Sequence, residues 1–494
     1  MSVKNGWYVR SVICLGSLLT LSVMSDAAWG IDPLLAGKSV STTAAAAMLV
    51  HDNAQICVFG QLANPLPLQE AVERSLCNNP KTREAWAQVK IAAAGVGIGR
   101  AAYLPTVSAD WQGVHDDTVT NVTGLPQFSS NYRSPVLRTD SVSLSWVLYD
   151  FGGRKATLAN ATELLAAAQA SQQAALETAF AGVANDYYAA QAAQGALAAA
   201  REIEQNANDS FHAATTRVDK GIAPLSDELQ AQTSWAEAIV NRTKAEGDWQ
   251  TELGTLASDM DLTPNVPIAL PDVGDGVAPG NDFDESVADL IEAAKRSHPS
   301  VMAAEAQLDA AIAKVNQTRA AGLPSLSLVA KYSENNDPTT LEIGIPQFPT
   351  TGHEWFVGFQ LTIPIFSGFG QTYQTHRAEA QVELQRDTLD EVQQQVMLDV
   401  WTSYQALQTS THNLGNSATL LDLAQRSYTT VQRRYQVGVG NILELLNAQS
   451  SLANAKRQRI EALTDWRSAR LQLAAKLGKL GMWDIASDAS SELK

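Results

Sequence analysis

Two cysteines carry the most specific side-chain chemistry in the sequence. Of the three cysteines, Cys14 lies in an N-terminal stretch that is typical of a removable export signal, which leaves Cys57 and Cys77. An even pair in an exported protein indicates a disulfide, because thiols are oxidised outside the cytoplasm. We expect this bond to join an N-terminal extension to the first helix. The alternative is a pair of free, buried thiols.

The other reactive residue types form no catalytic pattern. The seven histidines are scattered along the chain, and Gly152-Gly153 is too short and misplaced to form a phosphate-binding loop. We therefore predict no enzymatic activity, no metal and no cofactor. A formal net charge of -17 also disfavours nucleic acid as a partner, because phosphate backbones require basic surfaces.

The first 30 residues have the pattern of an export signal. Lys4 and Arg10 form a basic region, residues 11–23 are mostly apolar, and Ala28-Trp29-Gly30 offers small residues for cleavage. A membrane anchor is the alternative, but an apolar stretch of about 13 residues is too short to span a bilayer. No later segment approaches 18 uninterrupted apolar residues, so any membrane-spanning part must consist of strands.

The chain contains an internal duplication, which is the sequence signature of a repeated structural unit. The sequence at Arg100 returns at Arg319, a shift of 219, and the sequence at Arg217 returns at Arg434, a shift of 217. Each copy has the order short helix, second helix, paired strands and very long helix. We divide the chain into a signal peptide (1–30), an N-terminal extension (31–64), repeat 1 (65–264), a linker (265–281), repeat 2 (282–480) and a polar tail (481–494).

Alternating side chains predict two strands in each copy. Strands are expected at about 105–113 and 140–150 in repeat 1, and at about 324–333 and 354–366 in repeat 2, with polar loops between them. The period of two places apolar residues on one face and polar residues on the other. This pattern suits a transmembrane barrel strand, apolar toward lipid and polar toward a wet lumen, and it also suits an ordinary soluble sheet.

The segments that follow the strands predict very long helices. Residues 154–258 and 371–477 are rich in Ala, Gln, Glu and Leu, with one turn in each segment near Gly221 and Gly438. A helix of about 65 residues would reach roughly 95 Å, too long for a compact domain. Four strands cannot close a membrane barrel, whereas three chains would supply twelve. The predicted fold is an α+β membrane protein, with a shared transmembrane β-barrel continuous with an α-helical barrel.

This arrangement resembles the TolC family of outer-membrane channel-tunnel proteins. The match rests on the doubled Leu-Pro-x-(Val/Leu)-Ser sequence that starts at Leu104 and Leu323, on residues 149–154, and above all on residues 435–449. Together these segments extend the resemblance over nearly all of the mature chain. Cys57 and the sequence Leu76-Cys77-Asn78-Asn79-Pro80 are most similar to the CyaE-type branch, which serves type I secretion.

The resemblance implies a homotrimer in the outer membrane, with its helical barrel in the periplasm. A periplasmic adaptor (membrane fusion) protein and an inner-membrane ABC or other pump would be its partners, beside outer-membrane lipid. It also implies a constriction at the periplasmic tip, where Glu444 and Asn447 occupy the positions of two aspartates of the family prototype. Tyr435 matches a tyrosine of the closing network. Asp227 and Gln230 are the counterparts of Glu444 and Asn447 in repeat 1.

Two departures from the family pattern affect this expectation. Asn447 removes the second acidic ring, and Gly440 stands where the prototype has an arginine. The closed state is therefore expected to depend on other contacts. For Glu444 itself, the alternative role is that of an ordinary solvated carboxylate on a helix face.

The function expected is export of a protein through a duct by type I secretion. Efflux of drugs or other small molecules is the alternative, since it needs the same tube and different partners. A periplasmic or surface coiled-coil protein with a small sheet is an alternative of another class. The alternating strands with Trp146 and Phe359 speak against it, because a soluble stalk has no use for a lipid-facing band.

Overall fold

The computed structural model describes residues 32–41, 57, 59–120, 123–124, 130–272, 286–336 and 350–480. The expected signal peptide, the expected polar tail and residues 273–281 of the expected linker lie outside these ranges. The chain divides into two compact units. The first comprises residues 1–40, 90–165 and 310–381, and the second comprises 41–89, 166–309 and 382–494.

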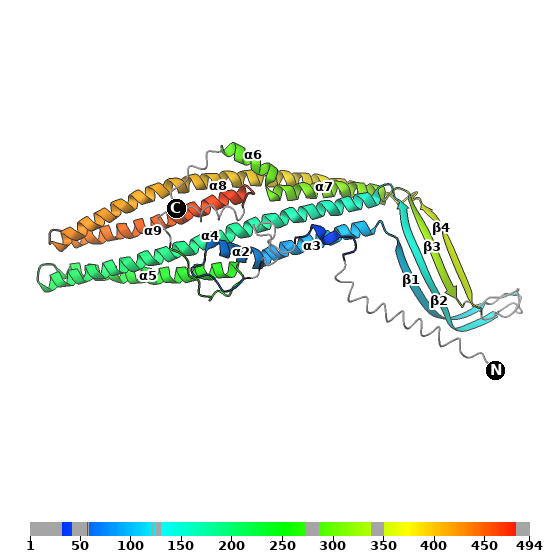
Figure 1. Cartoon of the computed structure of the whole chain (residues 1–494), viewed down its shortest axis with the longest axis horizontal. Helices are drawn as coiled ribbons and strands as arrows, with labels where there is room; N and C mark the ends of the chain where they lie inside the picture. Colours follow the sequence, from blue (N-terminus) through cyan, green and yellow to red (C-terminus); the bar gives the residue numbers. More distant parts are fainter. Residues whose placement is uncertain are drawn as a thin grey trace. The chain divides into compact units, whose positions relative to one another are not determined.

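The helices and strands repeat in the same order (Figure 1). After a short 3-10 helix η2 (Ala36–Ser39), the first copy contains α2 (Leu68–Asn78), α3 (Pro80–Ala101), β1 (Thr106–Thr120), β2 (Ser130–Tyr149), α4 (Gly153–Asp219) and α5 (Leu225–Asp259). The second copy contains α6 (Val287–Ser297), α7 (Pro299–Ala320), β3 (Ser325–Asn335), β4 (Gly352–Thr362), α8 (Gly370–Gln436) and α9 (Ile442–Lys476). Both ends of α8 and of α9 lie 217 positions after the matching ends of α4 and α5. The duplication therefore extends to the residue at which each helix begins and ends.

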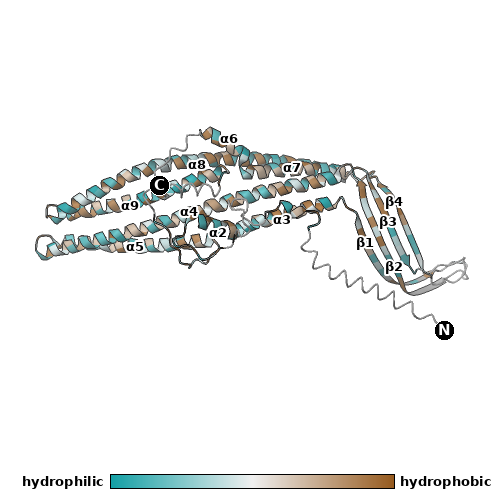
Figure 2. Ribbon diagram, in the orientation of Figure 1, coloured by the Kyte–Doolittle hydropathy of each residue, from teal (hydrophilic) through white to brown (hydrophobic). Residues whose placement is uncertain are grey.

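The four strands form one antiparallel sheet in the order β1-β2-β3-β4. Hydrophobic and hydrophilic residues alternate along the strands (Figure 2). The register aligns this alternation across the sheet: Ala109, Val142, Tyr332 and Trp355 form one row, and the next row is Asp110, Ser141, Ser333 and Glu354. Since paired residues share a face, one side of the sheet is apolar and the other is polar.

The first two strands are longer than the sequence indicates. Pairing continues from Thr106↔Ser145 to Thr120↔Ser130, so much of the polar loop expected between the first two strands is itself strand. In the second copy, β4 ends at Thr362, four residues before the expected end at 366. Backbone hydrogen bonds between β1 and β2 extend the ladder where the side chains, such as His115 and Asp117, no longer alternate.

Helix length follows from composition and from the position of proline. α4 and α8 each have 67 residues and contain no proline, which would remove a backbone hydrogen bond and interrupt the helix. Pro80 and Pro299 instead begin α3 and α7, where a missing N–H costs nothing. Within the described ranges, no helix combines the length and the apolar character needed to cross a bilayer.

The second unit contains the main apolar cores. One surrounds Leu76 and Phe180 and joins α2, α4 and α5, while another surrounds Val400 and Trp466 and joins α6, α8 and α9. Small residues such as Ala190 are fully buried along the long helices, which permits close packing between helices. Each core packs the two long helices of one hairpin together (Figure 1), and Leu471 of α9 also belongs to the first core, which links the two hairpins.

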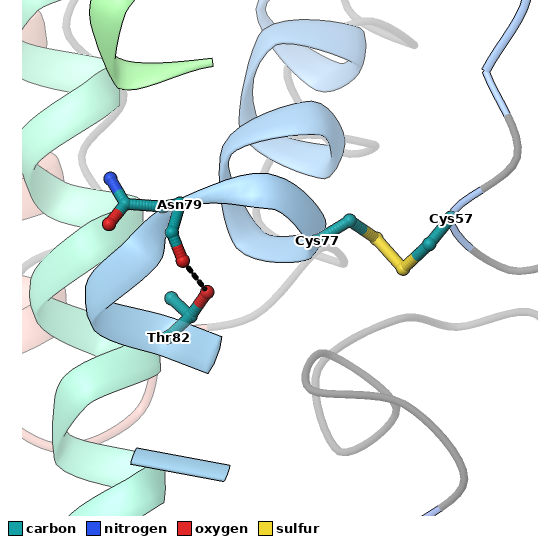
Figure 3. Close-up of a disulfide and its surroundings, with 4 residues drawn as sticks. All are labelled: Cys57, Cys77, Asn79 and Thr82. Carbon is teal, nitrogen blue, oxygen red and sulfur yellow. Dashed lines mark hydrogen bonds between the residues drawn. A yellow bond between two sulfur atoms is a disulfide. The ribbon is translucent and has the colours of Figure 1, made fainter. Parts of the chain in front are cut away.

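A disulfide links Cys57 to Cys77 near the end of α2 (Figure 3). The following turn is closed by Thr82, whose hydroxyl donates to the carbonyl of Asn79 at 2.8 Å. Arg74 adds a second link, because its Nη2 donates to the carbonyl of Gly60 at 2.9 Å and its guanidinium lies 4.9 Å from the centroid of the Phe59 ring. The disulfide and Arg74 therefore tie the segment before α2 to that helix.

Candidate functional site

The candidate site lies at the tips of the two helix hairpins, which belong to the second unit. Gly221 (φ 68°) follows α4 and Gly438 (φ 88°) follows α8, and both adopt the left-handed conformation that glycine tolerates best. In each copy, the N–H of this glycine and the N–H of the next residue donate to carbonyls of the last helical turn at 2.9–3.0 Å. These hydrogen bonds satisfy the free carbonyls at the helix end and reverse the chain.

Position 440 in this turn has no room for a side chain. A Cβ at this position would lie 2.7 Å from the backbone nitrogen of Tyr435 and 3.0 Å from the carbonyl carbon of Arg434. Its counterpart in the first copy, 217 positions earlier, is Ala223. The tight approach is therefore a feature of the second hairpin, and it explains why a large residue is absent from position 440.

Glu444 lies in the first turn of α9 and forms an ion pair across the turn. Asn441 caps the helix by accepting the N–H of Leu443 at 2.8 Å. The Oε2 of Glu444 lies 3.3 Å from Nη1 of Arg434, and both side chains are about half exposed (49% and 51%). An exposed pair of this kind contributes at most about 1 kcal/mol, so Glu444 is held loosely and remains accessible.

The other expected acidic and amide positions follow the same helix faces. Asn447 is exposed one turn after Glu444, and Gln230 is exposed on α5. Asp227 is half-buried in the first turn of α5, where an acidic residue suits the helix dipole. These side chains thus occupy the hairpin tips, as their sequence positions require.

Tyr435 is the buried member of the site and contacts the other hairpin. Its side chain is 3% exposed, and the Arg217 guanidinium lies 4.7 Å from the centroid of its ring. Nη1 of Arg217 also donates to the carbonyl of Tyr435 at 2.9 Å. Burial raises the pKa of Tyr435, an effect that Asp227 reinforces and Arg217 opposes. The buried hydroxyl has no hydrogen-bond partner in the described part of the chain.

An apolar cluster supports these contacts from below. Ala214 and Ala231 of the first hairpin pack with Tyr428, Ile442 and Leu445 of the second. All four long helices therefore share one core just behind their turns. This packing sets the position of Tyr435 and the helix ends that carry Arg217 and Arg434.

Sequence reasoning missed the two arginines of the tip. Arg217 and Arg434 occupy equivalent positions in the two copies, yet Arg217 contacts Tyr435 in the other hairpin and Arg434 contacts Glu444 in its own hairpin. The shift of 217 marks them as a duplicated pair, and that signal was available in the sequence. The choice of different partners depends on packing, which the repeat does not reveal.

The duplicated order of helices and strands, with the four-stranded sheet and the paired long hairpins, defines an outer-membrane channel fold. The chain belongs to the outer membrane efflux protein family, whose model matches residues 71–259 and 290–479. It is 31% identical over 427 residues to protein CyaE of Bordetella pertussis, covering 86% of this chain and 87% of that protein. It is 24% identical over 445 residues to the outer membrane efflux protein BepC of Brucella suis, covering 90% of this chain and 91% of BepC.

The likeness extends to solved structures. The outer membrane protein VceC of Vibrio cholerae superposes with a TM-score of 0.69 at 19% sequence identity, covering 83% of this chain and 96% of VceC. At this identity the match concerns the fold. The expected family, fold class and outer-membrane location are thereby confirmed.

Proposed function

We propose that this chain is one subunit of a homotrimeric export duct, without catalytic activity of its own, that carries a protein substrate out of the cell by type I secretion. The main support for the duct is the four-stranded sheet, which has an exposed apolar face and two open edges. Within the described residues, its edge strands β1 and β4 pair with no further strand. Open edges in lipid are costly, because each unpaired backbone group costs several kcal/mol.

Three copies would resolve these open edges. If β4 of each chain pairs with β1 of the next, twelve strands close into a barrel that has its apolar face toward lipid and its polar face toward the lumen. Cysteines introduced at Val357 on β4 and Ala109 on β1, joined by a flexible bifunctional thiol crosslinker that spans several residues of register, test this arrangement. Trimeric ladders on a denaturing gel would support it, and monomers alone would contradict it.

The hairpin tips would form the regulated end of the duct. Glu444 with Asn447, and Asp227 with Gln230, would line the constriction, while Tyr435 would help to hold the hairpins together. The exposure of Glu444 and the buried position of Tyr435 support these roles. Recruitment by a periplasmic adaptor and an inner-membrane pump would open this end.

Planar-bilayer recording of the purified protein is the deciding experiment. We expect small, cation-selective channels in the wild type, with higher conductance or weaker selectivity in Glu444→Ala. Arg434→Ala should have the opposite effect on selectivity, since it removes the cation 3.3 Å from Glu444. A pore whose conductance and selectivity are the same in both variants as in the wild type would support the duct and exclude Glu444 from the constriction. A protein that is soluble without detergent and forms no pore would favour a coiled-coil stalk.

Efflux of small molecules is the second candidate, supported by the likeness to BepC, which is named an efflux protein. The two candidates differ in the pump that docks on the duct. Deletion of the gene should abolish secretion of one extracellular protein under the leading proposal. Increased sensitivity to antibiotics or dyes with intact secretion would favour efflux instead.

A further inference from the structure

A groove of about 430 Å³ lies in the first unit, where the strands meet the helices. Its walls are the start of α4, which follows β2, and the end of α7, which precedes β3. Ala156 and Ala313, each 8% exposed, contribute apolar walls. Lys155, Asn316 and Arg319 contribute the polar groups. The groove thus has a small apolar interior and basic and amide groups around it.

The groove is connected to the apolar face of the sheet through one of its lining residues, Phe151. Tyr149 pairs with Leu326, and Leu326 pairs with Leu361, so these three side chains share that face. Phe151 lines the groove, and its ring centroid lies 4.8 Å from that of Tyr149. In a chain whose apolar sheet face contacts lipid, the groove therefore lies at the edge of the bilayer. Exposed aromatic side chains are typical of that depth.

The charge balance reverses around this junction. The whole chain has 35 Lys and Arg against 52 Asp and Glu. The four helix ends next to the sheet (residues 90–101, 150–165, 310–324 and 364–381) have an excess of basic residues instead. Seven basic residues (Lys90, Arg100, Arg154, Lys155, Lys314, Arg319, Arg377) stand there against three acidic ones (Asp150, Glu163, Glu379). A local positive excess in an acidic protein indicates an anionic partner at this level.

The basic side chains near the groove differ in how far contacts within the chain neutralise their charge. Arg154, outside the groove, is satisfied by Asp150 and by the carbonyls of Val147 and Leu148. Arg319 shares its charge with Glu379 at 2.7 Å. Lys155 is exposed and has no ion-pair partner in the part of the chain that the structure describes. The groove therefore presents at least one full uncompensated positive charge.

We infer that this groove binds the phosphate of an anionic phospholipid in the membrane leaflet next to the helices. Lys155, Arg319 and the Asn316 amide would contact the phosphate, and an acyl chain would follow Phe151 and the apolar strand face. Charged donors and phosphate oxygens make strong hydrogen bonds at the bilayer surface. The duplicated positions lack this set: Thr372 replaces Lys155 and Gly97 replaces Asn316, at shifts of 217 and 219. Each chain then has one such site.

Native mass spectrometry of the intact protein in neutral detergent tests the inference, with added phosphatidylglycerol or phosphatidylcholine as the probe. The wild type should retain phosphatidylglycerol in preference, one molecule per chain. The double variant Lys155→Ala/Arg319→Ala should bind it about tenfold more weakly, since charge-assisted contacts are lost. Equal retention of both lipids by the wild type, or unchanged binding in the double variant, would overturn the inference.

Two further variants separate the groove from general surface charge. Lys314→Ala removes one positive charge from α7, the helix that also carries Arg319, but Lys314 lies outside the groove and donates to Gln317 at 2.8 Å. Ala159→Met keeps the charge and fills the groove. Lys314→Ala should bind lipid as the wild type does, and Ala159→Met should lose it. The reverse pattern would overturn the inference. Pore formation, recorded separately, reports on folding and on the proposed duct, so a failure of that function is distinguishable from a failure of the lipid site.

Discussion

Arg217 and Tyr435 join the tips of two helix hairpins that are copies of one another. The guanidinium lies 4.7 Å from the ring centroid, and it donates to the carbonyl of the same tyrosine at 2.9 Å. This double contact crosses the boundary between the repeats at the end where Glu444 is exposed. Position 440, where the family prototype has an arginine, is glycine in this chain. Among the described residues, Arg217 is the basic side chain that contacts Tyr435 from the other hairpin.

Arg217→Ala should loosen the tip. The variant loses a cation–π contact of about 1–2 kcal/mol and a hydrogen bond of about 1 kcal/mol, so open states should become more frequent in single-channel recordings. Arg217→Lys should fall between Arg217→Ala and the wild type, because lysine keeps the charge and loses the planar stack. Arg433→Ala, an exposed arginine two residues before Tyr435, is the matched control. If Arg433→Ala opens the channel as much as Arg217→Ala, the specific contact has no role.

Gly440→Ala should produce the same phenotype by a steric route. The new Cβ would lie 2.7 Å from the backbone nitrogen of Tyr435, so the turn must shift and move the tyrosine away from Arg217. The expected loss is about 1–3 kcal/mol of local stability. Hydrogen exchange of residues 435–445 measures it. Gly415→Ala in the middle of α8 meets no atom within 4 Å and should be neutral or slightly stabilising. Equal protection of the tip in Gly440→Ala and the wild type would contradict the prediction.

The pair Asp186 and Asp259 should make the first hairpin less stable as pH rises. Burial, followed by the hydrogen bond and the charge of Asp186, raises the pKa of Asp259 from 3.8 to about 7, while Lys81 opposes the shift. The folded state therefore binds a proton more tightly than the unfolded state. The stabilisation of the folded state that comes from protonated Asp259 is fully present below about pH 4, and it is lost as the pH rises toward 7.

Asp259→Asn should remove the part of this pH dependence that Asp259 contributes and stabilise the protein above pH 7, by about 1–2 kcal/mol at this half-buried site. A smaller dependence should remain from Glu177, because burial raises the pKa of that carboxyl to about 7 as well. Thermal unfolding in detergent between pH 4 and 8 measures the difference. Asp261→Asn is the control, because that side chain forms only a 3.8 Å ion pair with Arg83 at the surface. A wild type whose stability rises over the same pH interval would contradict the assignment.

Reduction of the disulfide should release the segment before α2. A crosslink over 20 residues contributes about 3 kcal/mol by restricting the unfolded chain. Hydrogen exchange in α2 should increase on addition of a reductant, while the tips of the long hairpins should be unaffected. The double variant Cys57→Ser/Cys77→Ser should show the increased exchange with or without reductant. If hydrogen exchange in α2 is unchanged by the reductant and by the double variant, Arg74 and packing are sufficient to hold the segment on α2.

The sequence indicated the elements whose signals are local. Composition and the repeat predicted the long helices, and the alternation at Val142, Leu144 and Trp146 predicted the return strand and its apolar face. The extension of β1 to Thr120 escaped prediction, because there the ladder depends on backbone pairing with Ser130 and the side chains no longer alternate.

At the tip, the positions of Glu444 and Tyr435 followed from a motif, but their partners did not. Arg434 reaches Glu444 across a turn whose shape depends on Gly438 and Gly440. Arg217 reaches Tyr435 through the apolar cluster that holds both hairpins together. Contacts between segments some 200 residues apart require the packed structure.

The constant shift of 217 residues between α4 and α8, and between α5 and α9, has an evolutionary consequence. If three chains form the proposed barrel, an ancestor of half the length would have needed six subunits to present the same twelve strands. Every tip in such a ring would have been alike. After two copies fused into one chain, the sequences of the two tips could diverge. One arginine became free to contact a neighbouring hairpin while its twin turned to Glu444, an asymmetry that a ring of identical halves could not encode.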